Sequence, residues 1–126
     1  MNDLKQILSI EQETFRNGGV NKKTLLSIEK AFKEGLIIIK EKDKVLAYLG
    51  WEKHKKYKFP PYNHNCLKTH DKNGKLAYIS IITVREEYRN QGLGSKLIKI
   101  LEKIAHMHKC TKLYCPVKKK HPYLDK

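Results

Sequence analysis

The sequence predicts an α/β fold, with a β-hairpin near the middle of the chain and a strand–helix–strand unit in its second half. Two helical patterns precede the hairpin, and an uncharged apolar run, an amphipathic helix and a further strand pattern follow it. Connections of the strand–helix–strand kind are right-handed and make the two strands parallel. With 126 residues, 40% of them apolar, the chain can build one core but not two, so we expect a single domain over residues 1–126.

The N-terminal part of the chain predicts two helices. Apolar residues recur at helical spacing over residues 4–15, and the breaker cluster 17–19 (Asn-Gly-Gly) ends that pattern. A second pattern starts after Asn21, a good N-cap, and runs to Gly35. We expect Gly35 to adopt the left-handed conformation common at helix ends.

The hairpin is predicted by two apolar runs around a polar turn. Residues 36–39 form a β-branched run, residues 42–44 form the turn, and residues 45–51 form the second run. Residues 53–75 contain many turn residues, with aromatic residues between lysines, so we expect a long loop there.

The strand–helix–strand unit follows this loop. Residues 76–84 combine strong β propensity with no charge, as expected for a central strand covered on both faces. Residues 94–109 place an apolar stripe opposite lysines, which predicts a helix, and residues 112–117 predict the next strand.

The turn between the central strand and this helix carries the chemistry. It reads Arg89-Asn90-Gln91-Gly92-Leu93-Gly94-Ser95. A helix N-terminus exposes unpaired amides and the positive end of the helix dipole, and glycines let a ligand approach the backbone closely. The spacing matches neither a P-loop nor a dinucleotide-binding fingerprint. The turn therefore predicts an anion site of another kind.

The pattern R-x-x-G-x-G after an apolar strand ending in Val84 resembles the acetyl-CoA signature of the GNAT superfamily of N-acetyltransferases. The resemblance is specific over residues 76–105, and the order of elements extends it to residues 1–117. It implies a mixed, mostly antiparallel sheet flanked by helices, with a βαβ acetyl-CoA unit. It also implies transfer of acetyl from acetyl-CoA to a primary amine of a protein, peptide or small molecule by direct attack.

The resemblance also implies which residues bind the cosubstrate. Three residues of the central strand would offer backbone groups to the pantetheine arm: Ile82, Thr83 and Val84. Four amides would cradle the pyrophosphate, with three further residues nearby: Gln91, Gly92, Leu93 and Gly94, then Arg89, Asn90 and Ser95. No metal is expected in this site.

The catalytic groups depart from the family pattern. Many relatives place a carboxylate on the central strand, but residues 76–84 include no acidic residue or histidine. Glu52 and His54, on the neighbouring strand, are the nearest substitutes for a general base; the alternative is a solvated strand end. Tyr123 resembles the family's proton donor, against the alternative of a tail tyrosine. Tyr114 and Cys115 are fallback donors, or else core residues of a strand.

The chain also stops before the helix and two strands that normally finish this fold. The resemblance therefore implies truncated C-terminal elements, with either an exposed sheet edge or a homodimer that covers it. The missing carboxylate and short C-terminus support an alternative function, a catalytically degenerate GNAT fold that binds CoA or an acidic partner.

The net charge of +14 would attract polyanions. Of 27 basic residues, 24 are Lys, whereas proteins that read bases favour Arg, so a solvated basic surface is the simpler interpretation. A third function is nevertheless open: a nucleic-acid-binding protein that stacks bases on Tyr57, Phe59 and Tyr62. The charge favours an acidic acceptor over a polyamine.

Three cysteines in a chain without a signal-peptide pattern indicate reduced thiols. His64, Cys66 and His70 lie close in sequence, but no paired Cys-x2-Cys spacing supports zinc, so no metal is expected. The longest uncharged run, residues 76–84, is shorter than the roughly 20 residues of a membrane helix. We expect a cytoplasmic protein without a membrane partner.

Overall fold

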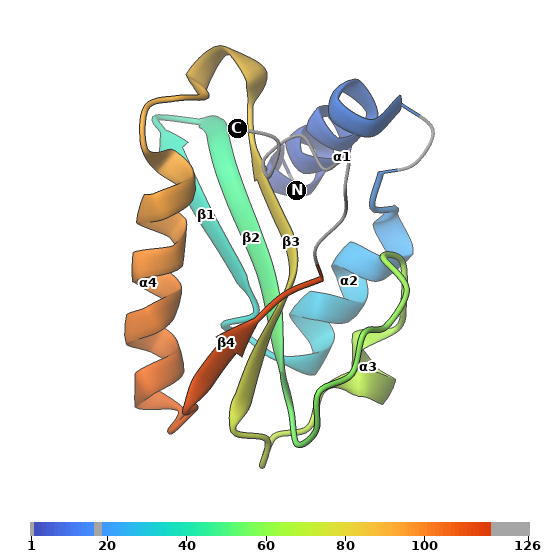
Figure 1. The fold of residues 1–126 in the computed structure, drawn as a ribbon. Helices are drawn as coiled ribbons and strands as arrows, with labels where there is room; N and C mark the ends of the chain where they lie inside the picture. Colours follow the sequence, from blue (N-terminus) through green and yellow to red (C-terminus); the bar gives the residue numbers. More distant parts are fainter. Residues whose placement is uncertain (1, 17–18, 117–126) are drawn as a thin grey trace.

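The described part of the computed structural model, residues 2–16 and 19–116, forms a four-stranded sheet with helices on both faces (Figure 1). Its elements, in chain order, are α1 (Asn2–Phe15), α2 (Lys22–Ala31), β1 (Leu36–Glu41), β2 (Lys44–His54), α3 (Cys66–Thr69), β3 (Leu76–Val84), the 3-10 turn η2 (Glu86–Tyr88), α4 (Leu93–Met107) and β4 (Lys112–Tyr114).

The strands lie in sequence order in the sheet. β2 pairs antiparallel with both β1 and β3, and β4 pairs parallel with β3. The β3–β4 pairing covers only the first three residues of β3, Leu76 to Tyr78. From Ile79 onward, the β4-side edge of β3 has no partner strand in the described part of the chain. The two parallel strands thus form a fork.

The two faces of the sheet have separate apolar clusters. α4 packs on one face through Leu97, Leu101 and Ala105, which contact apolar residues of β2 and β3. α1 and α2 pack on the other face, where Tyr48 and Ile81 belong to the second cluster. Figure 1 shows α4 on one side of the sheet and α1, α2 and α3 on the other. The gap between β3 and β4 therefore lies in a sheet that α4 covers on one face and α1 and α2 cover on the other.

The mixed sheet and the order of its elements confirm the predicted fold class. Two helices precede a hairpin, and β3, α4 and β4 form the predicted strand–helix–strand unit. β4 ends at Tyr114, earlier than predicted, and the long loop contains the short helix α3, which the sequence reading missed.

The prediction for Gly35 is wrong. α2 already ends at Ala31, and Gly35 does not have a positive φ. Its carbonyl instead accepts a hydrogen bond of 2.9 Å from the amide of Trp51. A Cβ at Gly35 would lie 3.0 Å from the Trp51 carbonyl oxygen. Glycine is therefore needed here because any side chain would crowd the backbone of β2.

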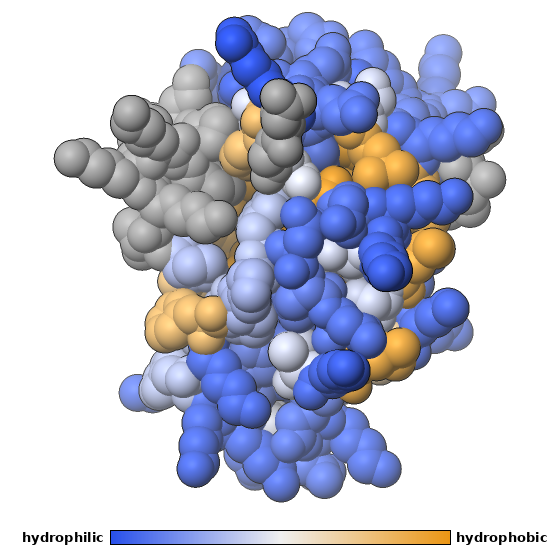
Figure 2. Space-filling model, turned by 90° about the vertical axis from the view of Figure 1, so that its right-hand side faces the viewer, coloured by the Kyte–Doolittle hydropathy of each residue, from blue (hydrophilic) through white to orange (hydrophobic). Residues whose placement is uncertain are grey.

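The side of the molecule formed by α1, α2 and α3 has a largely hydrophilic surface (Figure 2). Apolar side chains appear there in separate patches between polar ones. Within residues 2–16 and 19–116, no helix has both the length and the apolar character that crossing a membrane requires.

Candidate functional site

The open edge of β3 presents alternate backbone groups. Arg85 donates its amide to the Leu46 carbonyl of β2 at 2.8 Å, which fixes the alternation of the antiparallel ladder. The backbone groups of Thr83 consequently face β2, and those of Ile82 and Val84 face the open edge. The Val84 carbonyl already accepts a hydrogen bond of 2.9 Å from Arg89 Nε. Ile82 and the Val84 amide therefore remain for a ligand.

The turn after β3 ends in a set of unpaired amides. Gly92, the N-cap of α4, has φ 81°, and Asn90 also lies in the left-handed region at φ 65°. The first helical bond runs from the Lys96 amide to the Gly92 carbonyl at 3.0 Å. Three amides precede that of Lys96 in the helix, those of Leu93, Gly94 and Ser95. None of them has a hydrogen-bond acceptor among the described residues.

Space for a ligand lies beside these amides. Nothing lies within 4 Å of the position that a Cβ on Gly92 would occupy. Asn90, Gln91 and Gly92 are exposed, whereas Gly94 is buried at the start of α4. The amides and the positive end of the α4 dipole together suit an anion.

Arg89 holds this turn against its neighbours. Besides the bond to Val84, its guanidinium donates to Thr14 Oγ1 of α1 at 3.4 Å. Arg89 thus fastens the turn to the end of β3 and to α1.

A β-bulge lies near the beginning of the open edge of β3, two residues after the last β3–β4 pair. Gly50 pairs with Ile81 and the next residue, Trp51, pairs with Ile79, so Ser80 is the extra residue in β3. A bulge re-aims backbone groups and bends the strand. The run from Leu76 to Val84 is uncharged throughout and carries no turn residue that would signal the bulge.

Glu52 and His54 lie in β2 beside the fork. Glu52 is opposite Tyr78, which in turn forms the last β3–β4 pair with Tyr114. Both predicted base residues are 1% exposed, so they are not a solvated strand end. The apolar run of the sequence ends at Trp51, and β2 continues to His54, so both residues lie on the strand beside β3, as expected.

These two residues begin a hydrogen-bonded chain. His54 Nε2 contacts Glu52 Oε2, and His54 Nδ1 contacts the Tyr114 hydroxyl. Tyr114 also accepts a hydrogen bond of 2.9 Å from the Lys58 amide. Burial raises the pKa of Tyr114, so its hydroxyl stays protonated at neutral pH. These hydrogen bonds connect the buried Glu52 carboxylate to Tyr114, where β3 and β4 separate.

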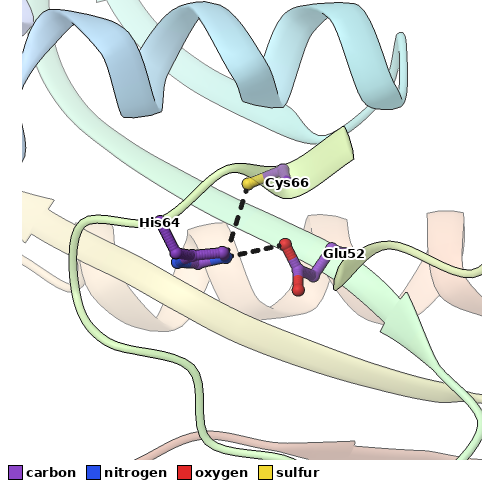
Figure 3. Close-up of side chains that lie close together, drawn as sticks. All are labelled: Glu52, His64 and Cys66. Carbon is purple, nitrogen blue, oxygen red and sulfur yellow. Dashed lines mark hydrogen bonds and ion pairs between the residues drawn. The ribbon is translucent and has the colours of Figure 1, made fainter. Parts of the chain in front are cut away.

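A second branch starts from the same carboxylate (Figure 3). His64, from the long loop, lies between Glu52 of β2 and Cys66 at the start of α3 and contacts both. Burial favours neutral forms here, but hydrogen bonds from His54 and His64 outweigh it and hold the pKa of Glu52 below its usual range. Burial likewise opposes protonation of His64, yet Cys66 and Glu52 raise its pKa to about 10. No local sequence signal joins these three residues.

A second buried carboxylate fastens α1 to the sheet. Glu11 is 1% exposed and accepts hydrogen bonds from four donors: Val20 N at 2.8 Å, Tyr62 OH at 2.8 Å, Thr83 Oγ1 at 3.0 Å and Tyr48 OH. Burial and the Glu11 carboxylate raise the pKa of both tyrosines well above the usual value. The Thr83 side chain thus has a structural role.

The remaining predicted residues lie elsewhere. Tyr123 is outside the described residues. Cys115 is half-buried just after β4, and burial raises the pKa of its thiol. A cavity of about 420 Å³ lies between α2 and the loop before α3, where His64 and Ser27 line it. Since α4 packs on the opposite face of the sheet, this cavity is separate from the amides of the turn.

Solved structures share this fold. The loading GNATL domain of CurA from Lyngbya majuscula is 18% identical, with a TM-score of 0.69 over 81% of this chain and 53% of that one. An aminoglycoside acetyltransferase, meta-AAC0020 from an uncultured soil metagenomic sample, in complex with sisomicin, is 19% identical, with a TM-score of 0.66 over 98% and 78%. The GphF GNAT-like decarboxylase in complex with isobutyryl-CoA is 14% identical, with a TM-score of 0.68 over 79% and 52%.

The present chain thus spans about half the length of the first and third of these structures. At such identities the likeness concerns the fold. No curated protein matches the sequence.

The family is shown by the sequence itself. The pattern of the Acetyltransferase (GNAT) family matches residues 4–123, nearly the whole chain. This range includes the fork, the open edge of β3 and the turn from Arg89 to Ser95. The resemblance inferred from the R-x-x-G-x-G pattern is confirmed, and the chain belongs to the GNAT acetyltransferase family.

Proposed function

We propose that this protein is an N-acetyltransferase that moves acetyl from acetyl-CoA to a primary amine of a protein, peptide or small molecule. One observation carries the proposal: the open edge of β3 leads directly into the unpaired amides at the start of α4. Membership of the GNAT family and the isobutyryl-CoA bound to the GphF decarboxylase support an acyl-CoA as the donor. The aminoglycoside acetyltransferase supports an amine as the acceptor.

The two parts of the site suit the two parts of the cosubstrate. The pantetheine arm, which contains amide groups, would pair with Ile82 and the Val84 amide in the manner of an added strand. The pyrophosphate would accept hydrogen bonds from the amides between Gln91 and Ser95. Gly92 leaves room for it, and Arg89 adds positive charge.

The reaction requires a neutral amine. An amine with a pKa near 10.4 is neutral in only about one molecule in 2,500 at pH 7, which costs roughly 4–5 kcal/mol. In the proposed reaction the amine nitrogen bonds to the thioester carbon, the carbon–sulfur bond breaks, and CoA leaves as a thiolate. One proton must leave the amine, and one must reach the sulfur.

The Tyr114–His54–Glu52 chain provides an acceptor for the amine proton. As Tyr114 takes that proton, its own proton passes to His54 Nδ1, and the Glu52 carboxylate stabilises the imidazolium. Glu52 and His54 would thus act as the general base expected from the sequence. Tyr114, where β3 and β4 separate, would be the group that meets the amine. Tyr123 remains the candidate that protonates the thiolate.

The coenzyme site is tested with Gly92→Glu and Gly92→Gln, which share the same unfavourable left-handed backbone and nearly the same size. Glu also places a negative charge beside the pyrophosphate, which costs about 1–4 kcal/mol for each charge pair at about 4 Å. We expect Gly92→Glu to abolish acetyl-CoA binding in calorimetry and Gly92→Gln to weaken it less. Unchanged affinity in Gly92→Glu would contradict the assignment.

The proton chain is tested with His54→Gln and Tyr114→Phe. We expect kcat to fall by about 10²–10⁴ with little change in acetyl-CoA affinity, since both residues act on a proton. Tyr57→Phe, which keeps the exposed ring beside Tyr114, is the matched control and should be active. A wild-type protein that binds acetyl-CoA but releases no CoA with any amine would support the degenerate alternative instead.

A further inference from the structure

Three potential metal ligands converge in the second branch of the buried cluster (Figure 3). His64 Nε2 lies 3.1 Å from Glu52 Oε1 and 3.5 Å from Cys66 Sγ. The three ligand atoms all lie within 4.8 Å of one another. In a tetrahedral zinc site, standard bond lengths place a nitrogen about 3.3 Å from an oxygen ligand and about 3.6 Å from a sulfur ligand. The observed spacing matches two edges of such a tetrahedron.

The protein orients two of these ligands by further hydrogen bonds. His64 Nδ1 lies 2.8 Å from the Pro61 carbonyl oxygen, so this nitrogen carries a proton and donates it. Nε2 consequently points at Glu52 and Cys66, and it would give up its own proton when a metal binds. The other oxygen of Glu52 contacts His54 Nε2, which leaves Oε1 aimed at the cluster. Ligands of bound metals are commonly held in this way.

The charges also fit a divalent cation. Glu52 is 1% exposed and Cys66 2% exposed. Burial raises the pKa of the Cys66 thiol, so its thiolate would form as the metal binds, and carboxylate and thiolate would then carry two negative charges. A neutral imidazole would repel the carboxylate that its lone pair faces, and a single proton on Nε2 can form a strong bond with only one of the two neighbours at a time. A dication binds all three groups and makes the site neutral.

Access is available through the cavity of about 420 Å³. His64 lines this cavity with polar side chains, among them Ser27 and Asn63. Of the three ligands only His64 lines the cavity, so a cation would enter past its imidazole, and a water molecule would complete the four-coordinate site.

We propose that Glu52, His64 and Cys66 bind one Zn²⁺ ion and thereby fasten the long loop and α3 to strand β2. This site replaces the sequence expectation of no metal, which rested on the lack of paired Cys-x2-Cys spacing, because β2 supplies Glu52 from a distant part of the chain. His70 is engaged elsewhere, since its Nδ1 accepts a hydrogen bond from the Lys53 amide at 3.0 Å. The proposal does not depend on acetyl transfer.

The test measures zinc bound to the full chain in the absence of CoA. Wild type and the variants Cys66→Ser, His64→Gln and Cys110→Ser are loaded with Zn²⁺, dialysed and analysed for metal per chain. Cys110→Ser is the matched control, because it removes a free thiol outside the cluster. We expect about one zinc per chain in wild type and in this control, and at least about tenfold weaker binding in the two ligand variants.

Cobalt gives a second readout, and its wild-type result tests the proposal without any variant. Co²⁺ bound by a thiolate produces a charge-transfer absorption band, which we expect in wild type and Cys110→Ser but not in Cys66→Ser. Wild type without bound zinc, or without this band, would overturn the proposal. Equal metal binding in Cys66→Ser would overturn it as well.

Discussion

The Glu11 cluster makes the stability of the fold depend on single hydroxyl groups. Tyr48 is fully buried and donates its hydroxyl proton to Glu11 Oε2, which has Thr83 Oγ1 as its other donor. Tyr48→Phe keeps the ring and removes only that donor. A hydrogen bond to a charged group contributes about 1.5–3 kcal/mol, so we expect a loss of about 2 kcal/mol in the free energy of unfolding.

Urea denaturation measures this loss. For a chain of this size the slope is about 1–2 kcal/mol per M, so the midpoint should fall by about 1–2 M. Tyr88→Phe is the matched control. Within the described part of the chain its hydroxyl contacts only Lys44 Nζ, at 3.4 Å in an exposed position, and we expect a change within about 0.5 kcal/mol. A Tyr48→Phe protein as stable as wild type, or a control equally destabilised, would refute the role of Glu11.

Three further outcomes follow from the structure. Gly74→Ala should destabilise by about 2–3 kcal/mol in thermal melts, because its Cβ would lie 2.6 Å from the His54 carbonyl group, whereas Gly50→Ala meets only isoleucine side chains and should cost less. Burial and the charge of Lys53 lower the pKa of His70, so the unfolded chain binds a proton at His70 more tightly than the folded chain does. The free energy of unfolding should therefore fall as the pH drops below about 6.5. Urea midpoints at two pH values should show a smaller fall in His70→Gln. Acetyl-CoA at about 100 times its Kd should add about 2.7 kcal/mol of stability, and an unchanged melting temperature would count against coenzyme binding.

The sequence predicts those features that depend on local signals. Asn21 caps α2, where its side chain accepts a hydrogen bond of 2.9 Å from the Thr24 amide, and α4 begins in the glycine-containing turn that the sequence placed before it. The uncharged run from Leu76 to Val84 forms a buried strand. Helix caps and strand propensity act within a few residues, so the pattern of residues reveals them.

Features that depend on contacts between distant segments could not be predicted in this way. The bulge at Ser80 interrupts no pattern, because every neighbour is apolar or small. Gly35 is required by a contact with Trp51 and not by its own conformation. The burial of Glu52 and its contact with His64 arise only when the long loop folds back onto β2.

The central claim is that an acyl-CoA binds along the open edge of β3 and at the start of α4. Amide chemical shifts of the labelled protein, recorded while CoA is added, test this claim most directly. We predict that the largest changes occur at Ile82, Val84 and residues 91–95, and that Gly92→Glu removes them. Changes confined to the cavity beside α2, or no saturable change at all, would contradict the claim.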